Sequence, residues 1–189
     1  MNEMDVRRAA VERLVAELRD HAPCDAREAA MCARIVAFIT TRPDAFERTA
    51  AAGHVTASAW IVDPARTQAL LLHHRKLDRW LQPGGHVDGD PDVRAAALRE
   101  AREETGLRTL RFAGEHVYDV DVHPIPARGT EPAHEHFDIR FALEADPREP
   151  LRGNDESHEV RWVALDDLDR YAIDDSVRRL AAKVTTLPS

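Results

Sequence analysis

Three glutamates crowd into one short segment near the middle of the sequence. Glu100, Glu103 and Glu104 stand three and four positions apart, so on a helix their side chains share one face. Apolar side chains project onto the same face: Val93, Ala96, Ala97 and Leu107. We therefore expect partial burial, and desolvated carboxylates this close together either take up protons or bind a cation. A trio of oxygen donors suits Mg²⁺ or Mn²⁺, which predicts a divalent-metal site.

Signals for the start and the end of this helix flank the glutamates. A Gly84-Gly85 turn precedes the helix and can point a backbone carbonyl at the same ion. Asp90 is predicted as the N-cap, with Pro91 in the first helical position, where its missing N–H leaves no partner unsatisfied. Gly106 predicts the C-terminal end, which favours a residue that tolerates positive φ. The glutamates should then occupy the second half of a short helix.

Composition limits the classes of function. The 189 residues, 43% apolar and 32% charged, suit one globular domain with its own core and a small extension. A net charge of −8 argues against sequence-independent binding of nucleic acid, although a cation can mediate the binding of a small anion. Cys24 and Cys32 match neither a zinc-pair nor a redox spacing, and we expect reduced thiols. Without a signal-peptide pattern or a run of about 20 apolar residues, a cytoplasmic protein is expected.

The elements that position the glutamates fall into two parts. Apolar residues at helical spacing over residues 6–18 and 25–42 predict a helical extension spanning residues 1–50. It is expected to cap the main domain, with a homodimer contact as the alternative. Over residues 51–189, short strands, the glutamate helix and a terminal helix from about Asp166 predict an α/β sandwich. Strands are predicted over residues 54–62, 68–74, 111–122, 134–145 and 160–165.

One of these strands has a wholly polar face. From residue 134 to residue 141 a mainly apolar set alternates with His134, His136, Asp138 and Arg140. One interpretation is a core strand backed by solvent. The other interpretation makes His136, Asp138 and Arg140 part of a substrate cleft, in contact with a phosphate or a base. Near the Gly-Gly turn, further polar side chains are able to join them: His74, Arg75, Lys76 and His86.

The segment from Gly85 to Leu107 resembles the Nudix box, G-x5-E-x7-R-E-U-x-E-E-x-G-U, where U is apolar. Arg99-Glu100-Ala101-Arg102-Glu103-Glu104-Thr105-Gly106-Leu107 follows Gly85 at the spacing of the pattern. Two positions depart from it: Ala101 is a small apolar residue, and Pro91 replaces the first glutamate. That glutamate lies mostly outside the metal site in the family, so we expect Pro91 to alter loop geometry more than chemistry. The resemblance extends from about Thr56 to Leu168.

This resemblance implies a Nudix-type α/β/α sandwich with a mixed sheet. It also implies a Mg²⁺-dependent hydrolase that cleaves a diphosphate linked to another moiety, often in a nucleoside diphosphate derivative. Carried over by position, Glu100, Glu103 and Glu104 are metal ligands together with the Gly84 carbonyl, and Arg99 fixes the glutamates by an ion pair. The metal neutralises and orients the diphosphate and lowers the pKa of the attacking water.

One further carboxylate usually acts as a base or an extra metal ligand in the family. Glu159, in the segment SHEVRW, is the first candidate here, and Glu156 is the second. A surface acid without a catalytic role is the alternative for both residues.

Two other functions on the same fold compete with hydrolysis. A non-catalytic ligand sensor is expected to lack a box glutamate or to carry a basic DNA-binding module. An isoprenoid diphosphate isomerase needs a catalytic cysteine inside the fold, whereas Cys24 and Cys32 both lie in the extension. The expected partner is a small-molecule diphosphate rather than a nucleic-acid polymer or a membrane. Dinucleotide polyphosphates, nucleotide sugars, oxidised nucleotides and non-nucleotide diphosphates all remain open as substrates.

Overall fold

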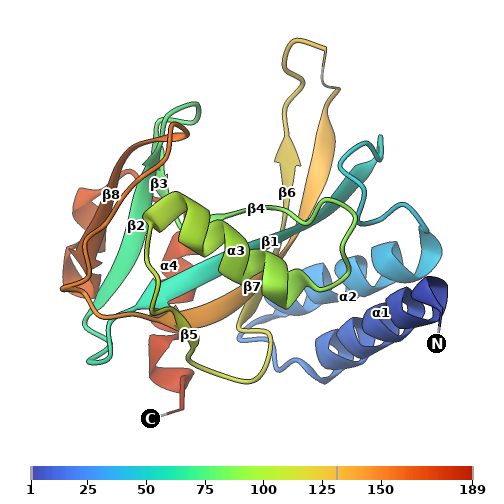
Figure 1. Ribbon diagram of the computed structural model, residues 1–189, viewed down its shortest axis with the longest axis horizontal. Coiled ribbons are helices and arrows are strands. Elements are labelled where there is room, and N and C mark those ends of the chain that lie inside the picture. The colour runs from blue at the N-terminus through green and yellow to red at the C-terminus, as the bar shows by residue number, and fades with distance from the viewer. Residues whose placement is uncertain (1, 131, 189) are drawn as a thin grey trace. The chain divides into compact units, whose positions relative to one another are not determined.

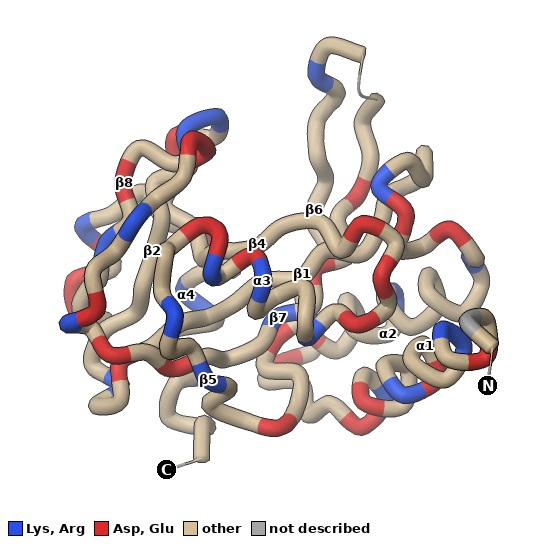
Figure 2. Tube along the Cα trace, viewed as in Figure 1, with Lys and Arg blue, Asp and Glu red and all other residues tan. Residues whose placement is uncertain are grey.

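A computed structural model describes residues 2–130 and 132–188. The chain divides into two compact units, which we describe separately. The first unit comprises Met1–Ala57, Gly85–Ala96 and His116–Arg140, and the second comprises Ser58–Gly84, Ala97–Glu115 and Phe141–Ser189. Acidic and basic residues are interspersed along both units (Figure 2). Within the described residues, no helix has the length and apolar character needed to cross a membrane.

Two N-terminal helices lie side by side in the first unit (Figure 1). Helix α1 spans Glu3–Asp20 and α2 spans Ala26–Thr41, which confirms both predicted helices. The Asp25 side chain begins α2 by accepting a hydrogen bond from the Glu28 backbone N–H. The helices bury apolar residues at helical spacing: Leu14, Val15 and Leu18 on α1, and Met31, Ile35 and Ile39 on α2.

Helix α2 packs against a hairpin in the same unit. The hairpin pairs β6 (Asp119–Ile125) in antiparallel register with β7 (His134–Glu144). Phe38 of α2 stacks on Phe137 of β7 with ring centroids 3.9 Å apart. Strand β1 (Gly53–Val62) begins beside this hairpin, where Gly53 has φ 138°. A Cβ atom on Gly53 would lie 2.3 Å from the Glu135 carbonyl oxygen, so glycine permits this close approach of the two strands.

Antiparallel strands and a compact core form the second unit. Strand β2 (Gln68–His74) pairs with β3 (Arg79–Leu81), with β8 (Ser157–Ala164) and with the end of β1. Strand β5 (Arg111–Phe112) pairs with the end of β7. The core contains Ala59, Ile61, Leu70, Ala101, Leu107, Leu110, Leu143 and Ala145. The second unit also holds a 3-10 helix, η1 (Leu165–Arg170), then α4 (Asp175–Ala182) and a final 3-10 turn, η2 (Val184–Thr186).

The strands form one sheet in the order β3-β2-β1-β7-β5. Three further strands pair with members of this series: β4 (Gly84–His86) with β1, β6 with β7, and β8 with β2. Together with helix α3 (Val93–Thr105), this arrangement confirms the predicted α/β class. Two expectations were wrong. The single strand predicted over residues 111–122 is two strands, β5 and β6, because residues 113–118 bend away between them. The terminal helix starts at Asp175 rather than near Asp166, since the chain first makes η1 and Asp174 then supplies the helix cap.

Candidate active site

Helix α3 carries the three glutamates, and its N-terminal end lies in the first unit. The Asp92 side chain caps the helix by accepting a hydrogen bond from the Ala95 backbone N–H at 3.0 Å. Asp90 instead accepts a hydrogen bond from the Asp92 backbone N–H at 2.9 Å. The predicted N-cap at Asp90 is therefore wrong by two residues, and Pro91 precedes the helix. The reason is local: Asp92 offers the same capping chemistry, while the Asp90 carboxylate is engaged in the preceding turn.

The C-terminal end of α3 lies in the second unit and agrees with the prediction. Gly106 has φ 73° and donates its backbone N–H to the Arg102 carbonyl oxygen at 2.9 Å. A Cβ atom on Gly106 would lie 2.7 Å from the Arg152 Cβ atom, so the position is also sterically restricted. Ala101 and Leu107 are buried in the core of the second unit. These contacts fix the C-terminal half of the helix against the core of the second unit.

The three carboxylates differ in exposure. Glu104 is buried at 5% exposure, Glu100 is half-buried and Glu103 is exposed. The Gly84 backbone N–H donates a hydrogen bond to Glu104 Oε2 at 2.8 Å. Burial raises the pKa of Glu104 to about 8; the Gly84 hydrogen bond opposes this rise, and the Glu100, Glu156 and Glu103 carboxylates add to it. A bound cation would favour the ionised form of this buried group.

Arg99 precedes the first glutamate and bridges two of the three. Its Nη1 atom lies 2.6 Å from Glu100 Oε1 and 3.7 Å from Glu103 Oε2. The guanidinium thereby restricts both side chains on the exposed side of the helix. Its role in holding metal ligands stays a prediction.

The two candidates for a fourth carboxylate occupy different surroundings. Glu159 lies on β8 and its carboxylate accepts a hydrogen bond from Arg161 Nε at 2.7 Å. Glu156 lies just before β8, and its charge is among those that raise the pKa of Glu104. The Arg75 backbone N–H donates to the Glu156 carbonyl oxygen at 2.8 Å, which anchors the loop. Which of the two carboxylates serves as the base or the extra ligand stays a prediction.

Arg75, a predicted substrate contact, lies beside this loop in the second unit. Its Nη2 atom donates a hydrogen bond to the Ser157 carbonyl oxygen at 3.0 Å. The side chain is thus held next to the segment that carries Glu156.

The other predicted substrate contacts lie in the first unit: His86, His136, Asp138 and Arg140. The polar face of β7 is not backed by solvent, because Asp138 and Arg140 are buried at 2% and 1% exposure. The Arg140 guanidinium forms ion pairs with Asp138 at 2.7 Å, with Asp119 at 3.2 Å and with Asp121 at 3.5 Å. Strand β6 supplies the last two carboxylates, which sequence alternation on β7 alone did not reveal. Contact of these side chains with substrate stays a prediction.

Sequence analysis suggested that His86 joins His136 but missed His54 and the histidine cluster that the three form in the first unit. Ring nitrogens of His54, His86 and His136 lie within 4.8 Å of one another, close enough to bind one metal ion. Burial, together with the neighbouring imidazoles, lowers the pKa of His54 to about 4 and that of His136 to about 2. The available signal was a His-x-His pair on one strand with a third histidine directly after the Gly-Gly turn.

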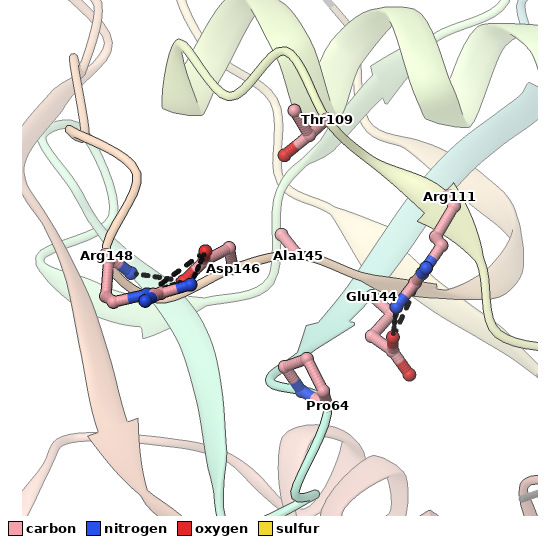
Figure 3. Close-up of a pocket in the computed structure, with 7 residues that line it drawn as sticks. All are labelled: Pro64, Thr109, Arg111, Glu144, Ala145, Asp146 and Arg148. Carbon is pink, nitrogen blue, oxygen red and sulfur yellow. Dashed lines mark hydrogen bonds and ion pairs between the residues drawn. The ribbon is translucent and has the colours of Figure 1, made fainter.

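A cavity of about 380 Å³ in the second unit is lined by other residues: Pro64, Thr109, Arg111, Glu144, Ala145, Asp146 and Arg148 (Figure 3). Its two arginines already pair with acids, Arg111 with Glu144 and Arg148 with Asp146. None of the predicted site residues lines it. The cavity therefore does not extend the glutamate site.

Comparison with known proteins agrees with the sequence motif and the fold. The family model of the NUDIX domain matches residues 53–184. A MutT NUDIX hydrolase from Burkholderia pseudomallei is 26% identical, with a TM-score of 0.54 over 70% of this chain and 98% of that chain. An Ap4A hydrolase from C. elegans is 19% identical, with a TM-score of 0.51 over 70% and 95% of the two chains. The NUDIX domain of Shewanella oneidensis NrtR, solved with ADP ribose, is 16% identical, with a TM-score of 0.51 over 82% and 96%. No protein of curated function matches the sequence.

Proposed function

We propose that this chain, which belongs to the Nudix family of hydrolases, cleaves small-molecule diphosphates with Mg²⁺ or Mn²⁺. Hydrolases of this family act on acid anhydrides in phosphorus-containing compounds. The observation that carries the proposal is a buried carboxylate, Glu104, whose ionisation is opposed by burial and by the nearby Glu100, Glu103 and Glu156. A hard divalent cation is the natural complement to such a group of oxygen donors.

The residues present fit a hard divalent cation. Glu100, Glu103 and Glu104 would hold it together with the Gly84 carbonyl, and all four donors are oxygen atoms. When bound, the cation neutralises the diphosphate and lowers the pKa of the attacking water. The chain itself contributes the positioning: Arg99 restrains Glu100 and Glu103, and the Gly84 N–H restrains Glu104.

Glu156 is our first choice for the general base, with Glu159 as the alternative. A base must be ionised and accessible to take the proton from water, and the exposed Glu156 meets the second requirement. The negative charge of Glu156 contributes to the raised pKa of Glu104. The Glu159 carboxylate instead accepts a hydrogen bond from Arg161. Arg75 remains our candidate for a contact to a substrate phosphate, and its hydrogen bonds to the carbonyl oxygens of Glu156 and Ser157, which hold it beside the Glu156 loop, support this choice.

A hydrolysis assay tests the proposal. We would incubate wild type, Glu103→Gln and Glu12→Gln with a panel of dinucleotide polyphosphates, nucleotide sugars, oxidised nucleotides and non-nucleotide diphosphates. Released phosphate is measured after a coupling phosphatase, with Mg²⁺, with Mn²⁺ and with chelator. Glu103 is exposed, so its replacement should leave the core intact. Glu12→Gln on α1 is a matched change of charge at another exposed glutamate, whose side chain pairs with Arg8.

Metal-dependent turnover by wild type and Glu12→Gln, lost in Glu103→Gln, is the expected result. Equal turnover by Glu103→Gln would contradict the assigned metal site. Metal binding by calorimetry without turnover of any compound would instead favour the non-catalytic ligand sensor.

We also propose a division into a helical extension, residues 1–50, and a Nudix domain, residues 51–189, in a cytoplasmic protein. The family match beginning at residue 53 supports this boundary. Cys24 and Cys32 are not joined by a disulfide, which agrees with a reducing compartment.

A further inference from the structure

We propose that the first unit binds a second type of metal ion, a transition-metal cation with Zn²⁺ as the best fit, through His54, His86 and His136, with His134 as the fourth ligand. This site goes beyond the proposed hydrolysis. It uses nitrogen donors, whereas the glutamate site uses oxygen donors.

The three histidines reach one point from three different strands. His54 is the second residue of β1, His86 ends β4 and His136 lies near the start of β7. Their ring centroids are separated by 4.8 Å for His54 and His136, 5.0 Å for His54 and His86, and 5.5 Å for His86 and His136. The close approach of β1 to β7 at Gly53 brings His54 to this point. The convergence is thus a product of the backbone arrangement.

His54 provides a second and independent observation. It is buried at 1% exposure, and neither of its ring nitrogens has a hydrogen-bond partner among the described residues. Buried polar side-chain atoms are partnered in the large majority of cases, so such a ring calls for an explanation. A metal ion accepts the lone pair of a neutral imidazole and would supply a partner for one of the two ring nitrogens.

The contact between His134 and His136 already has the spacing of two metal ligands. His134 Nδ1 lies 2.9 Å from the Pro132 carbonyl oxygen, which can only accept, so Nδ1 carries the proton and Nε2 presents a lone pair. That Nε2 accepts a hydrogen bond from Nε2 of His136 at 3.3 Å, so His136 would have to move its proton to Nδ1 in order to bind a metal through Nε2. A tetrahedral zinc ion with Zn–N bonds of about 2.0 to 2.1 Å places neighbouring ligand nitrogens about 3.3 Å apart. Binding would draw His54 and His86 inward to the same spacing.

The surroundings also favour a cation. His123 lies opposite His136 in the β6–β7 register, and its Nδ1 atom is 3.0 Å from Asp121 Oδ2. The Asp121 carboxylate thus brings negative charge close to the histidine cluster. On the same hairpin, one guanidinium pairs with three buried carboxylates: Asp119, Asp121 and Asp138 around Arg140. Imidazole ligands favour Zn²⁺ and its transition-metal neighbours over Mg²⁺.

Metal binding by protein without an affinity tag tests the site directly. We would strip wild type with a chelator, titrate Zn²⁺ by calorimetry, count bound zinc by elemental analysis, and record the visible spectrum with Co²⁺. The variants are His86→Gln and His136→Gln, on different strands. His158→Gln is the matched control, an exposed histidine on β8, and Glu103→Gln separates this site from the glutamates. Circular dichroism establishes that each variant is folded.

We expect one zinc ion per wild-type chain and a tetrahedral Co²⁺ spectrum. His86→Gln and His136→Gln should each weaken zinc binding by about tenfold or more, because each loses a direct ligand. His158→Gln and Glu103→Gln should bind as wild type does. Unchanged zinc affinity in both ligand variants, or loss of zinc in Glu103→Gln alone, overturns the proposal. If the ligand variants do not fold, wild type decides: failure to bind stoichiometric zinc overturns the site. These readouts do not depend on hydrolysis, so each proposal can fail separately.

Discussion

Replacing Arg140 by methionine separates a structural role for this arginine from a role in substrate binding. Its side chain is 2% exposed and lies within ion-pair distance of Asp119, Asp121 and Asp138. Methionine keeps much of the length and volume but removes the charge. The variant leaves three carboxylates buried in the first unit without their guanidinium partner.

The expected cost follows from this burial. Removing one partner of a buried ion pair lowers the free energy of unfolding by about 3 to 5 kcal/mol, because the remaining charge stays buried without an opposite charge beside it. Here three acids lose the same partner, so we expect a loss of at least about 3 kcal/mol. Arg34 of α2 offers a control, since it pairs with Glu135 of the same hairpin at 2.8 Å and both side chains are well exposed. An exposed pair contributes up to about 1 kcal/mol, so Arg34→Met should be mild.

Urea unfolding followed by circular dichroism measures both changes, and hydrogen exchange of the β6 and β7 amides localises them to the first unit. The double variant Arg140→Met with Asp119→Asn should recover part of the loss, because one stranded charge is removed. A loss below about 1 kcal/mol for Arg140→Met, combined with a raised KM for substrate, would refute the structural assignment. Arg140 would then be a phosphate contact, as the sequence first suggested.

Three further predictions concern the second unit. Gly106→Ala should cost about 1 to 3 kcal/mol in urea unfolding, because φ is 73° and the new Cβ would meet Arg152 at 2.7 Å; a neutral effect would contradict this steric argument. Glu156→Gln should lower kcat more than Glu159→Gln does; the reverse order in hydrolysis assays would restore Glu159 as the base. Hydrogen bonds from Thr109 and Arg108 lower the pKa of Glu149 below its usual range. The stability contributed by this carboxylate is present above the unfolded-state pKa and is lost as pH falls through the folded-state pKa. Glu149→Gln should therefore lower the urea midpoint more at pH 7 than at pH 4, and equal differences at both pH values would exclude the effect.

Local signals in the sequence predicted the two N-terminal helices and the end of α3, but not the start of the terminal helix. The N-terminal helices followed from apolar residues at helical spacing, and α3 ends at Gly106 because glycine tolerates positive φ there. The start of α3 was placed two residues early because Asp90 and Asp92 carry the same capping group. Only hydrogen-bond partners distinguish the two aspartates.

Strand patterns were less informative, because alternation states which residues share a face and not what covers that face. The polar face of β7 suggested solvent or a cleft, but β6 buries it by bringing carboxylates to Arg140. The break between β5 and β6 likewise depends on pairing with β7, which is distant in the sequence.

The sequence by itself determined the acidic cluster, because Glu100, Glu103 and Glu104 share a helix face through local geometry alone. The tertiary structure decided which of them is buried, since the partner of Glu104 is a backbone N–H twenty residues away in the sequence. It also decided the histidine cluster, whose members come from separate strands that meet where Gly53 lets two backbones approach. Short-range spacing specifies the face on which a side chain lies, whereas burial, charge and ligand geometry depend on what long-range packing places against it.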